Sequence, residues 1–408
     1  MLLAACPGRP QRPHVPPAPA QTIAIAGAVR AVGADELATY AAAASKAWAF
    51  RGGKPAWEVE LPGKASVLAR AGELVAIGVA ASGGSLRGDP GAIVVAHDRK
   101  TGKQRWSLAF DSTEWAIVSS VTALGNDLIV GGLFAGTLRV GTRVVSSGGN
   151  SDGFVARVGA NGQLAWLVRM GGVGADGVQG VAVRGERIAI AGTFAAGADL
   201  LGQALVPYDD RSPVSDAFVA ELDGKGARQW AATFGGKGDD AIAGVTIDDT
   251  GNVVVAANVR EVVHVGGAQL VTQGASDGLV AWFGKGGEKG PAVLVGGLDY
   301  DGLRAIVAVG DRVVVGGFFS GSIKLGERTL KAGGGDDAFI AALDGSGTVA
   351  TSWHIGGAGR EEVAALDATS GGFVAGIQHT AAATIEDTKL AAPKDPMAGS
   401  ALIVRGVP

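Results

Sequence analysis

A short phrase recurs four times along this chain at nearly constant spacing, and this repeat is the strongest constraint on the fold. Each copy begins with Asp, a small residue and a large apolar residue, and leads through a Gly turn to a Gly-Gly pair. The copies start at Asp152, Asp216, Asp277 and Asp337, which are 64, 61 and 60 positions apart. Such a period indicates an architecture in which each unit packs mainly against its neighbours.

Each repeat contains four short apolar runs bounded by Gly, Asp and Asn turns, the pattern of strands joined by hairpins. One four-stranded sheet cannot cover both of its own faces, whereas radial repetition buries each sheet between two neighbours. The sequence therefore predicts an all-β, seven-bladed β-propeller, with six or eight blades as alternatives if the weak early units are misassigned. The first strand of a blade is expected seven times, near residues 28–32, 67–71, 121–124, 181–183, 245–247, 306–309 and 363–366.

The two ends of the repeat region complement each other. The third strand of the last blade is expected at residues 401–404, and only four residues follow it. Residues 22–26, with the sequence Thr-Ile-Ala-Ile-Ala, precede the first blade and belong to none. We expect this segment to supply the missing fourth strand and close the ring, so that residues 22–408 form the propeller.

The repeated phrase resembles the SBBP-type β-propeller repeat of bacterial secreted proteins. The resemblance is carried by Asp-Ala-Phe-Val-Ala at residues 216–220, by Trp230 and by Phe-Gly-Gly at residues 234–236. Residues 95–106 resemble the related PQQ-type propeller repeat. The resemblance covers roughly residues 22–405 and implies the fold, but members of such families share an architecture and not one activity.

The single cysteine, Cys6, excludes an intramolecular disulfide and a Cys-based zinc site. Leu3, Ala4 and Ala5 precede it as in a bacterial lipobox, which predicts lipidation of Cys6, with residues 1–6 as the remainder of the signal. The missing upstream basic and apolar segments indicate a misplaced start or a truncated sequence, and a chance cysteine is the alternative. The Pro-rich residues 7–21 then form a semi-rigid tether. By resemblance to Gram-negative lipoproteins, Pro7 implies outer-membrane sorting, facing the periplasm or the surface.

Two rows of acidic residues recur with the repeat. Both are expected on one face of the propeller, with the row before the first strands around the channel mouth. They could attract a cationic partner or Ca²⁺, but recurrence in nearly every blade favours capping of turn N–H groups. The row before the first strands is Asp176, Asp240, Asp301 and Glu361, and the row before the third strands is Asp89, Asp152, Asp216, Asp277 and Asp337.

Insertions of about one hairpin are expected between the second and third strands of blades three to seven, which predicts an uneven loop face with a notch. They cover residues 138–151, 201–215, 265–276, 325–336 and 385–397. Binding sites favour loops on rigid scaffolds. In the most distinctive of these loops, we expect Tyr208, Asp209, Asp210 and Arg211 to contact a binding partner. Five tryptophans at one strand position could form an aromatic platform, but packing between blades is favoured; they are Trp57, Trp106, Trp166, Trp230 and Trp353.

No catalytic constellation is found in the sequence: the five histidines are scattered, and neither a Gly-x-Ser-x-Gly motif nor a cysteine nucleophile is present. The net charge of −4 argues against nucleic-acid binding, and no apolar run approaches a membrane-spanning length. We therefore expect a monomeric, non-catalytic binding or scaffold lipoprotein of the cell envelope, with a protein or glycan partner and no metal or cofactor. The alternatives are a propeller enzyme, either quinoprotein-like or acting on polysaccharide, and a surface adhesion or structural module.

Overall fold

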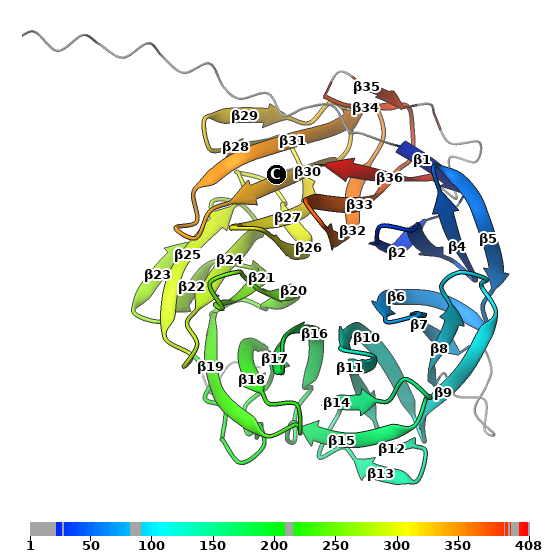
Figure 1. The fold of residues 1–408 in the computed structure, drawn as a ribbon. Helices are drawn as coiled ribbons and strands as arrows, with labels where there is room; N and C mark the ends of the chain where they lie inside the picture. Colours follow the sequence, from blue (N-terminus) through cyan, green and yellow to red (C-terminus); the bar gives the residue numbers. More distant parts are fainter. Residues whose placement is uncertain are drawn as a thin grey trace, which may run out of the picture.

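The computed structural model describes residues 22–26, 28–81, 91–208, 215–386, 388–390, 392 and 400–406, whose regular elements are all strands. The strands form seven antiparallel sheets with four radial strands each, and hairpins extend several of them. Figure 1 shows these sheets as blades around a central axis. The β-propeller predicted from the repeat is therefore confirmed.

The first strand of each blade lies next to the axis. These innermost strands contact one another in chain order, and the last contacts the first, so they form a closed ring. All seven lie at or next to the positions expected from the sequence. They are β2 (Val29–Ala34), β6 (Gly63–Ala71), β10 (Trp115–Leu124), β16 (Gly177–Arg184), β20 (Ala241–Ile247), β26 (Gly302–Val309) and β32 (Glu361–Thr369).

The second and third strands form the middle of each blade. They are apolar at nearly every position because a neighbouring blade covers each face of the sheet. The second strands are β3 (Thr39–Ala43), β7 (Leu74–Ala81), β11 (Asp127–Ala135), β17 (Arg187–Phe194), β21 (Val253–Val259), β27 (Arg312–Phe319) and β33 (Gly372–His379). The third strands are β4 (Lys46–Arg51), β8 (Ala92–Asp98), β14 (Asp152–Val158), β18 (Asp216–Leu222), β24 (Asp277–Phe283), β30 (Asp337–Leu343) and β36 (Ser400–Gly406).

The outermost strand of the last blade comes from the other end of the chain. In this position β1 pairs with β36 in antiparallel register, with Thr22 opposite Val404 and Ala26 opposite Ser400. The predicted closure by residues 22–26 is therefore confirmed. The outermost strands are β1 (Thr22–Ala26), β5 (Lys54–Glu60), β9 (Gln104–Ser112), β15 (Leu164–Met170), β19 (Arg228–Gly236), β25 (Lys289–Val295) and β31 (Val349–Gly357).

Four of the five predicted insertions form hairpins, and they attach to the blade before their own. Strand β12 pairs with β9, β22 with β19, and β34 with β31, so three hairpins extend the preceding sheet at its outer edge. This pairing covers edge strands that would otherwise expose unpaired N–H and C=O groups. These three insertions therefore widen the preceding blades, and the uneven loop face with a notch stays a prediction. The hairpins are β12 (Thr137–Val140) with β13 (Arg143–Ser146), β22 (Val262–Val265) with β23 (Ala268–Val271), β28 (Ser322–Leu325) with β29 (Arg328–Lys331), and β34 (Ala383–Ile385) with β35 (Thr388–Leu390).

The tryptophans of the outermost strands pack against the next blade, as favoured from the sequence. In four of the five cases the ring lies over a glycine with positive φ in the turn between the third and fourth strands of that blade, whereas Trp353 packs edge-on against Phe373 of the last blade. Trp57 lies on Gly102, and a Cβ on this glycine would be 2.9 Å from the indole ring. Trp230 lies on Gly287 in the same way. The Gly turn and the Trp of the repeated phrase are therefore two halves of one contact between blades.

Candidate functional site

The connections of the propeller emerge on two opposite faces. One face carries the connections from second to third strands and those from each outermost strand to the next blade, and we call it the loop face. The opposite face carries the turns between first and second and between third and outermost strands, and we call it the turn face. The acidic rows and Tyr208 belong to the loop face, as expected from the sequence.

Eight carboxylates of the two acidic rows are buried, with exposed fractions between 0% and 4%. Asp176 accepts hydrogen bonds from the N–H groups of Gly172 (2.6 Å) and Ala195 (2.8 Å). Asp301 accepts the equivalent bonds from Gly297 (2.6 Å) and Ser320 (3.0 Å). These contacts match the capping interpretation, in which a carboxylate satisfies turn N–H groups. Asp89 lies outside the described residues.

Burial also perturbs the ionisation of the row before the first strands. It raises the pKa of Asp240 to about 8, and the charge of Asp216 adds to the increase. It raises the pKa of Glu361 to about 7, with Asp337 adding to the increase, and that of Asp301 to about 6. Asp176, Asp240 and Asp301 lie beneath the surface, so direct contact between them and a macromolecular partner is not supported. Glu361 is buried as well but lines a cavity on the loop face.

The Gly-Gly pair of the repeat lies where the outermost strand of one blade meets the insertion of the next, and the close contacts there require glycine. A Cβ on the first glycine, Gly235, would lie 2.1 Å from the carboxylate of Asp216. A Cβ on the second, Gly236, would lie 1.6 Å from the backbone oxygen of Val262 in the attached hairpin. The other three pairs meet the same two obstacles, an acidic side chain and the backbone of the next insertion. The pair therefore marks where an insertion meets the outermost strand of the preceding blade.

Tyr208 is half exposed on the loop face, and its ring stacks on His264 of β22, with the ring centroids 4.2 Å apart. The backbone N–H of Tyr208 donates a hydrogen bond to the carboxylate of Asp216. The residue is thus held between two blades and is still accessible. The other contact candidates of this loop, Asp209, Asp210 and Arg211, lie outside the described residues.

Large exposed apolar side chains concentrate on the loop face. Of the nine among the described residues, only Leu37 belongs to a turn-face connection and only Ile117 to a first strand. The most exposed are Leu298 (79%), Val173 (74%) and Val206 (70%). The seven on loop-face connections are Val144, Val173, Val206, Tyr208, Val271, Leu298 and Tyr300. Sequence reasoning missed Leu298 and Tyr300, although comparison of the segments after each Gly-Gly pair would have found them.

A cavity of about 290 Å³ lies beside Tyr300 on the loop face, between the blades of β26 and β32. The guanidinium of Arg304 lies 4.7 Å from the centre of the Phe318 ring, and Tyr300 packs against that ring. On the other side, Arg360 forms an ion pair with Asp336 at 2.6 Å. This combination of aromatic rings and arginines is typical of binding hot spots.

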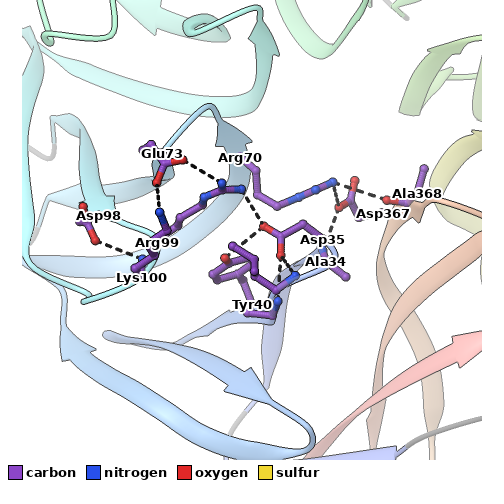
Figure 2. Close-up of polar contacts among 12 residues, drawn as sticks. Ala34, Asp35, Tyr40, Arg70, Glu73, Asp98, Arg99, Lys100, Asp367 and Ala368 are labelled. Atoms are coloured by element: carbon purple, nitrogen blue, oxygen red, sulfur yellow. Dashed lines mark hydrogen bonds and ion pairs between the residues drawn. The ribbon is translucent and has the colours of Figure 1, made fainter.

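The turn face carries a polar cluster that sequence reasoning missed (Figure 2). Arg99 forms ion pairs with Asp35 (3.4 Å) and Glu73 (2.9 Å), and Tyr40 donates a hydrogen bond to Asp35. Burial and the nearby Asp35 raise the pKa of Tyr40 well above its usual range, so its hydroxyl stays protonated and donates. The cluster therefore ties the first blade to the second.

Beside this cluster, Arg70 of β6 reaches Asp367 of β32. The backbone N–H of Ala34 in β2 donates to the same carboxylate oxygen at 3.1 Å. One carboxylate therefore joins three blades where the ring closes. Arg70 and Arg99 also line a cavity of about 590 Å³ on this face.

The channel along the axis is narrow, with a volume of about 300 Å³, and all seven first strands line it. Ser66 donates to the backbone oxygen of Val118 in the next blade at 3.0 Å, and Ser119 donates to that of Val178. Among the described residues, no three His, Cys, Asp or Glu side chains come together in a geometry that could hold a metal ion. No helix of the described part is long and apolar enough to cross a membrane.

Comparison with protein-family models finds no match for the sequence, and comparison with curated proteins finds none either. Among solved structures, BamB from Moraxella catarrhalis is 16% identical over 95% of this chain and 99% of its own, with a TM-score of 0.48. A chain of a mitotic checkpoint complex is 10% identical over 100% of both chains, with a TM-score of 0.51. Identities this low concern the fold alone.

Proposed function

We propose that this chain is a non-catalytic binding propeller of the bacterial cell envelope, tethered by a lipid on Cys6, and that its loop face holds a protein partner. The observation that carries the proposal is the concentration of exposed apolar side chains on that face. Contiguous apolar surface marks interaction sites, because leaving it in water is unfavourable. The proposal takes the bias of exposed apolar residues toward one face as the sign of such a surface.

The arc from Tyr208 to Tyr300 is the part of the loop face best suited to anchor the partner. Tyr208 is fixed by stacking on His264, so little rotamer freedom is lost when a partner covers it. Tyr300 lies at the edge of the 290 Å³ cavity, where a partner side chain could insert beside the Arg304–Phe318 pair. Leu298, two residues before Tyr300 in the same connection, adds exposed apolar area.

The proposed anchor rests on the sequence Leu3-Ala4-Ala5-Cys6 and on the Pro-rich residues that follow it. A complete precursor with a restored signal should be found in the membrane fraction, and its Cys6→Ser variant should be released as soluble protein. Continued membrane association of the Cys6→Ser variant would contradict lipid anchoring and would leave the loop-face proposal standing.

The loop face is tested by affinity capture from envelope extracts. The double variant Leu298→Ser, Tyr300→Ser should lose the captured partner, and Tyr208→Ala should weaken its capture. The control is Lys225→Ser, at an exposed residue in the turn between β18 and β19 on the turn face, which should leave capture unchanged. Equal capture by the double variant and the wild type would refute a partner on this part of the loop face.

A further inference from the structure

The 590 Å³ cavity on the turn face lies where the last, first and second blades meet. Its wall is built from the connection between β2 and β3, the end of β6 and the turn between β32 and β33. Arg70 and Arg99 are only partly exposed there, with side-chain exposed fractions of 28% and 23%. A cavity of this volume is large enough for a small ligand.

This region departs from the repeat. The connection between β2 and β3 spans residues 35–38, whereas five of the six equivalent turns contain only two residues. Asp35 stabilises the longer connection by accepting hydrogen bonds from the N–H groups of Leu37 (2.7 Å) and Ala38 (2.8 Å). The sixth turn, residues 248–252 between β20 and β21, is longer still and is capped by Asp248 in the same way, so the longer connection at residues 35–38 matters here only as part of the cavity wall.

Both arginines at the cavity are already paired within the protein, whereas Glu36, which also lines it, is exposed and forms no ion pair among the described residues. Arg70 is paired with Asp367, and Arg99 with both Asp35 and Glu73. An anionic ligand would have to displace a carboxylate from one of these arginines and would be repelled by Glu36, and displacing a partner leaves a partly buried charge unsatisfied. A cationic ligand would be repelled by Arg70 and Arg99. A neutral ligand does not meet these costs.

Hydrogen-bonding capacity nevertheless remains at the cavity. Among the described residues, Arg70 uses only Nη2, for Asp367 and the backbone oxygen of Ala368, so its Nε and Nη1 donors are available. The hydroxyl groups of Thr369 and Ser370 line the same wall. Leu37, which is 47% exposed, adds an apolar surface at the edge.

We propose that this cavity binds a neutral polyhydroxylated ligand, namely a saccharide of one or two rings or the end of a glycan chain. Hydroxyl groups of a sugar both donate and accept, so they match fixed arginine donors beside serine, threonine and carboxylate groups. The fixed ion pairs keep the donors in place before binding, which lowers the ordering cost. The site is on the face opposite the proposed protein partner and does not depend on it.

The test titrates the purified protein with maltose and with N-acetylglucosamine, followed by calorimetry. Saturable binding with a roughly millimolar Kd is expected for at least one of them. Ser370→Trp, which fills the cavity from an exposed turn, should weaken binding more than about tenfold, and Leu37→Ser about threefold. Lys225→Trp, in an exposed turn between β18 and β19 on the same face, is the matched control and should bind like the wild type.

Retention on insoluble cell-wall glycan, lost in Ser370→Trp and kept in Lys225→Trp, would identify a chain end rather than a free sugar as the ligand. The absence of binding to both sugars at tens of millimolar and to the glycan would overturn the proposal. Equal binding by Ser370→Trp, or tighter binding of inorganic phosphate than of either sugar, would overturn it as well. Ser370→Trp should leave capture by the loop face unchanged, so the two proposals fail independently.

Discussion

Arg70 of the second blade and Asp367 of the last blade meet across the first blade, with Arg70 Nη2 2.7 Å from Asp367 Oδ2 (Figure 2). Gly33 of β2 lies beneath this contact, and a Cβ there would be 3.5 Å from both Arg70 Nε and Asp367 Oδ2 and only 2.9 Å from Leu68. The ion pair spans the junction at which the two ends of the chain close the ring. It thus adds a side-chain link to the backbone pairing of β1 with β36.

Substitution of Asp367 by Ala should destabilise the propeller more than loss of an ordinary surface ion pair. It removes the acceptor of both Arg70 and the N–H of Ala34, and the expected loss is about 1 to 2 kcal/mol in the free energy of unfolding. Urea unfolding measures it. Asp249→Ala, which removes the partner of Arg184 at an exposed site, is the control and should cost less than about 0.5 kcal/mol. Equal losses in the two variants would contradict a special role for the Arg70–Asp367 pair.

Substitution of Gly236 by Ala should be costly, although alanine is small. Its Cβ would lie 1.6 Å from the backbone oxygen of Val262, so β22 would have to move away from β19. Overpacking of this kind costs about 1 to 3 kcal/mol. At Gly267 a Cβ would meet no atom within 4 Å, and Gly267→Ala should therefore change the unfolding midpoint little. The pairing of the insertion with the preceding blade is wrong if the two variants unfold alike.

A contact between blades can be predicted from the sequence when it recurs from one blade to the next. Trp230 on Gly287, and Gly235 against Asp216, repeat at most junctions between blades. The residues involved therefore recur about every 60 positions, and this period predicts the ring. The closing strand was predictable as well, because one blade would otherwise lack its fourth strand. Arg70 and Asp367, by contrast, are 297 positions apart and occur once. A single contact of this kind leaves no periodic signal, and only the fold brings its two residues together.

The sequence was less informative about the loop face. The acidic rows were placed correctly but are buried, since an acidic residue that caps a turn and one that faces a ligand look the same in a sequence. The insertions were recognised as hairpins, yet their pairing with the preceding blade depends on contacts between segments that differ in every repeat. Tyr208 is accessible as expected, whereas the exposure of Leu298 and Tyr300 became apparent only from the structure.

Substitution of Trp230 by Leu should weaken the contact between its blade and the next. The ring is 8% exposed, lies over Gly287 and donates a hydrogen bond to Glu221 at 3.2 Å. Loss of that area and of the hydrogen bond should cost about 2 to 4 kcal/mol by urea unfolding. In the following blade, Val293 packs on Gly347 in the equivalent way. Val293→Ala should cost less, about 1 kcal/mol, because fewer buried atoms are removed. A larger loss at Val293 than at Trp230 would contradict this account.

The buried carboxyls predict that the propeller loses stability as the pH rises. Burial raises the pKa of Asp240 to about 8 and that of Glu361 to about 7 in the folded protein, whereas unfolding restores their ordinary values near 4. The folded state therefore binds more protons between about pH 4 and pH 8. The contribution of these groups is fully present below about pH 4 and is lost as the pH rises through 7 and 8.

Urea unfolding at a series of pH values measures this loss, which has a slope of at most about 1.4 kcal/mol per pH unit for each group. Asp240→Asn keeps the shape of the neutral carboxyl but cannot ionise, so its stability should fall less steeply above pH 6 than that of the wild type. Asp311→Asn, at a side chain that is 94% exposed, is the matched control and should follow the wild-type curve. A parallel pH dependence of Asp240→Asn and the wild type would show that the Asp240 carboxyl is already ionised in the folded protein at neutral pH, and that its neighbours compensate for its burial.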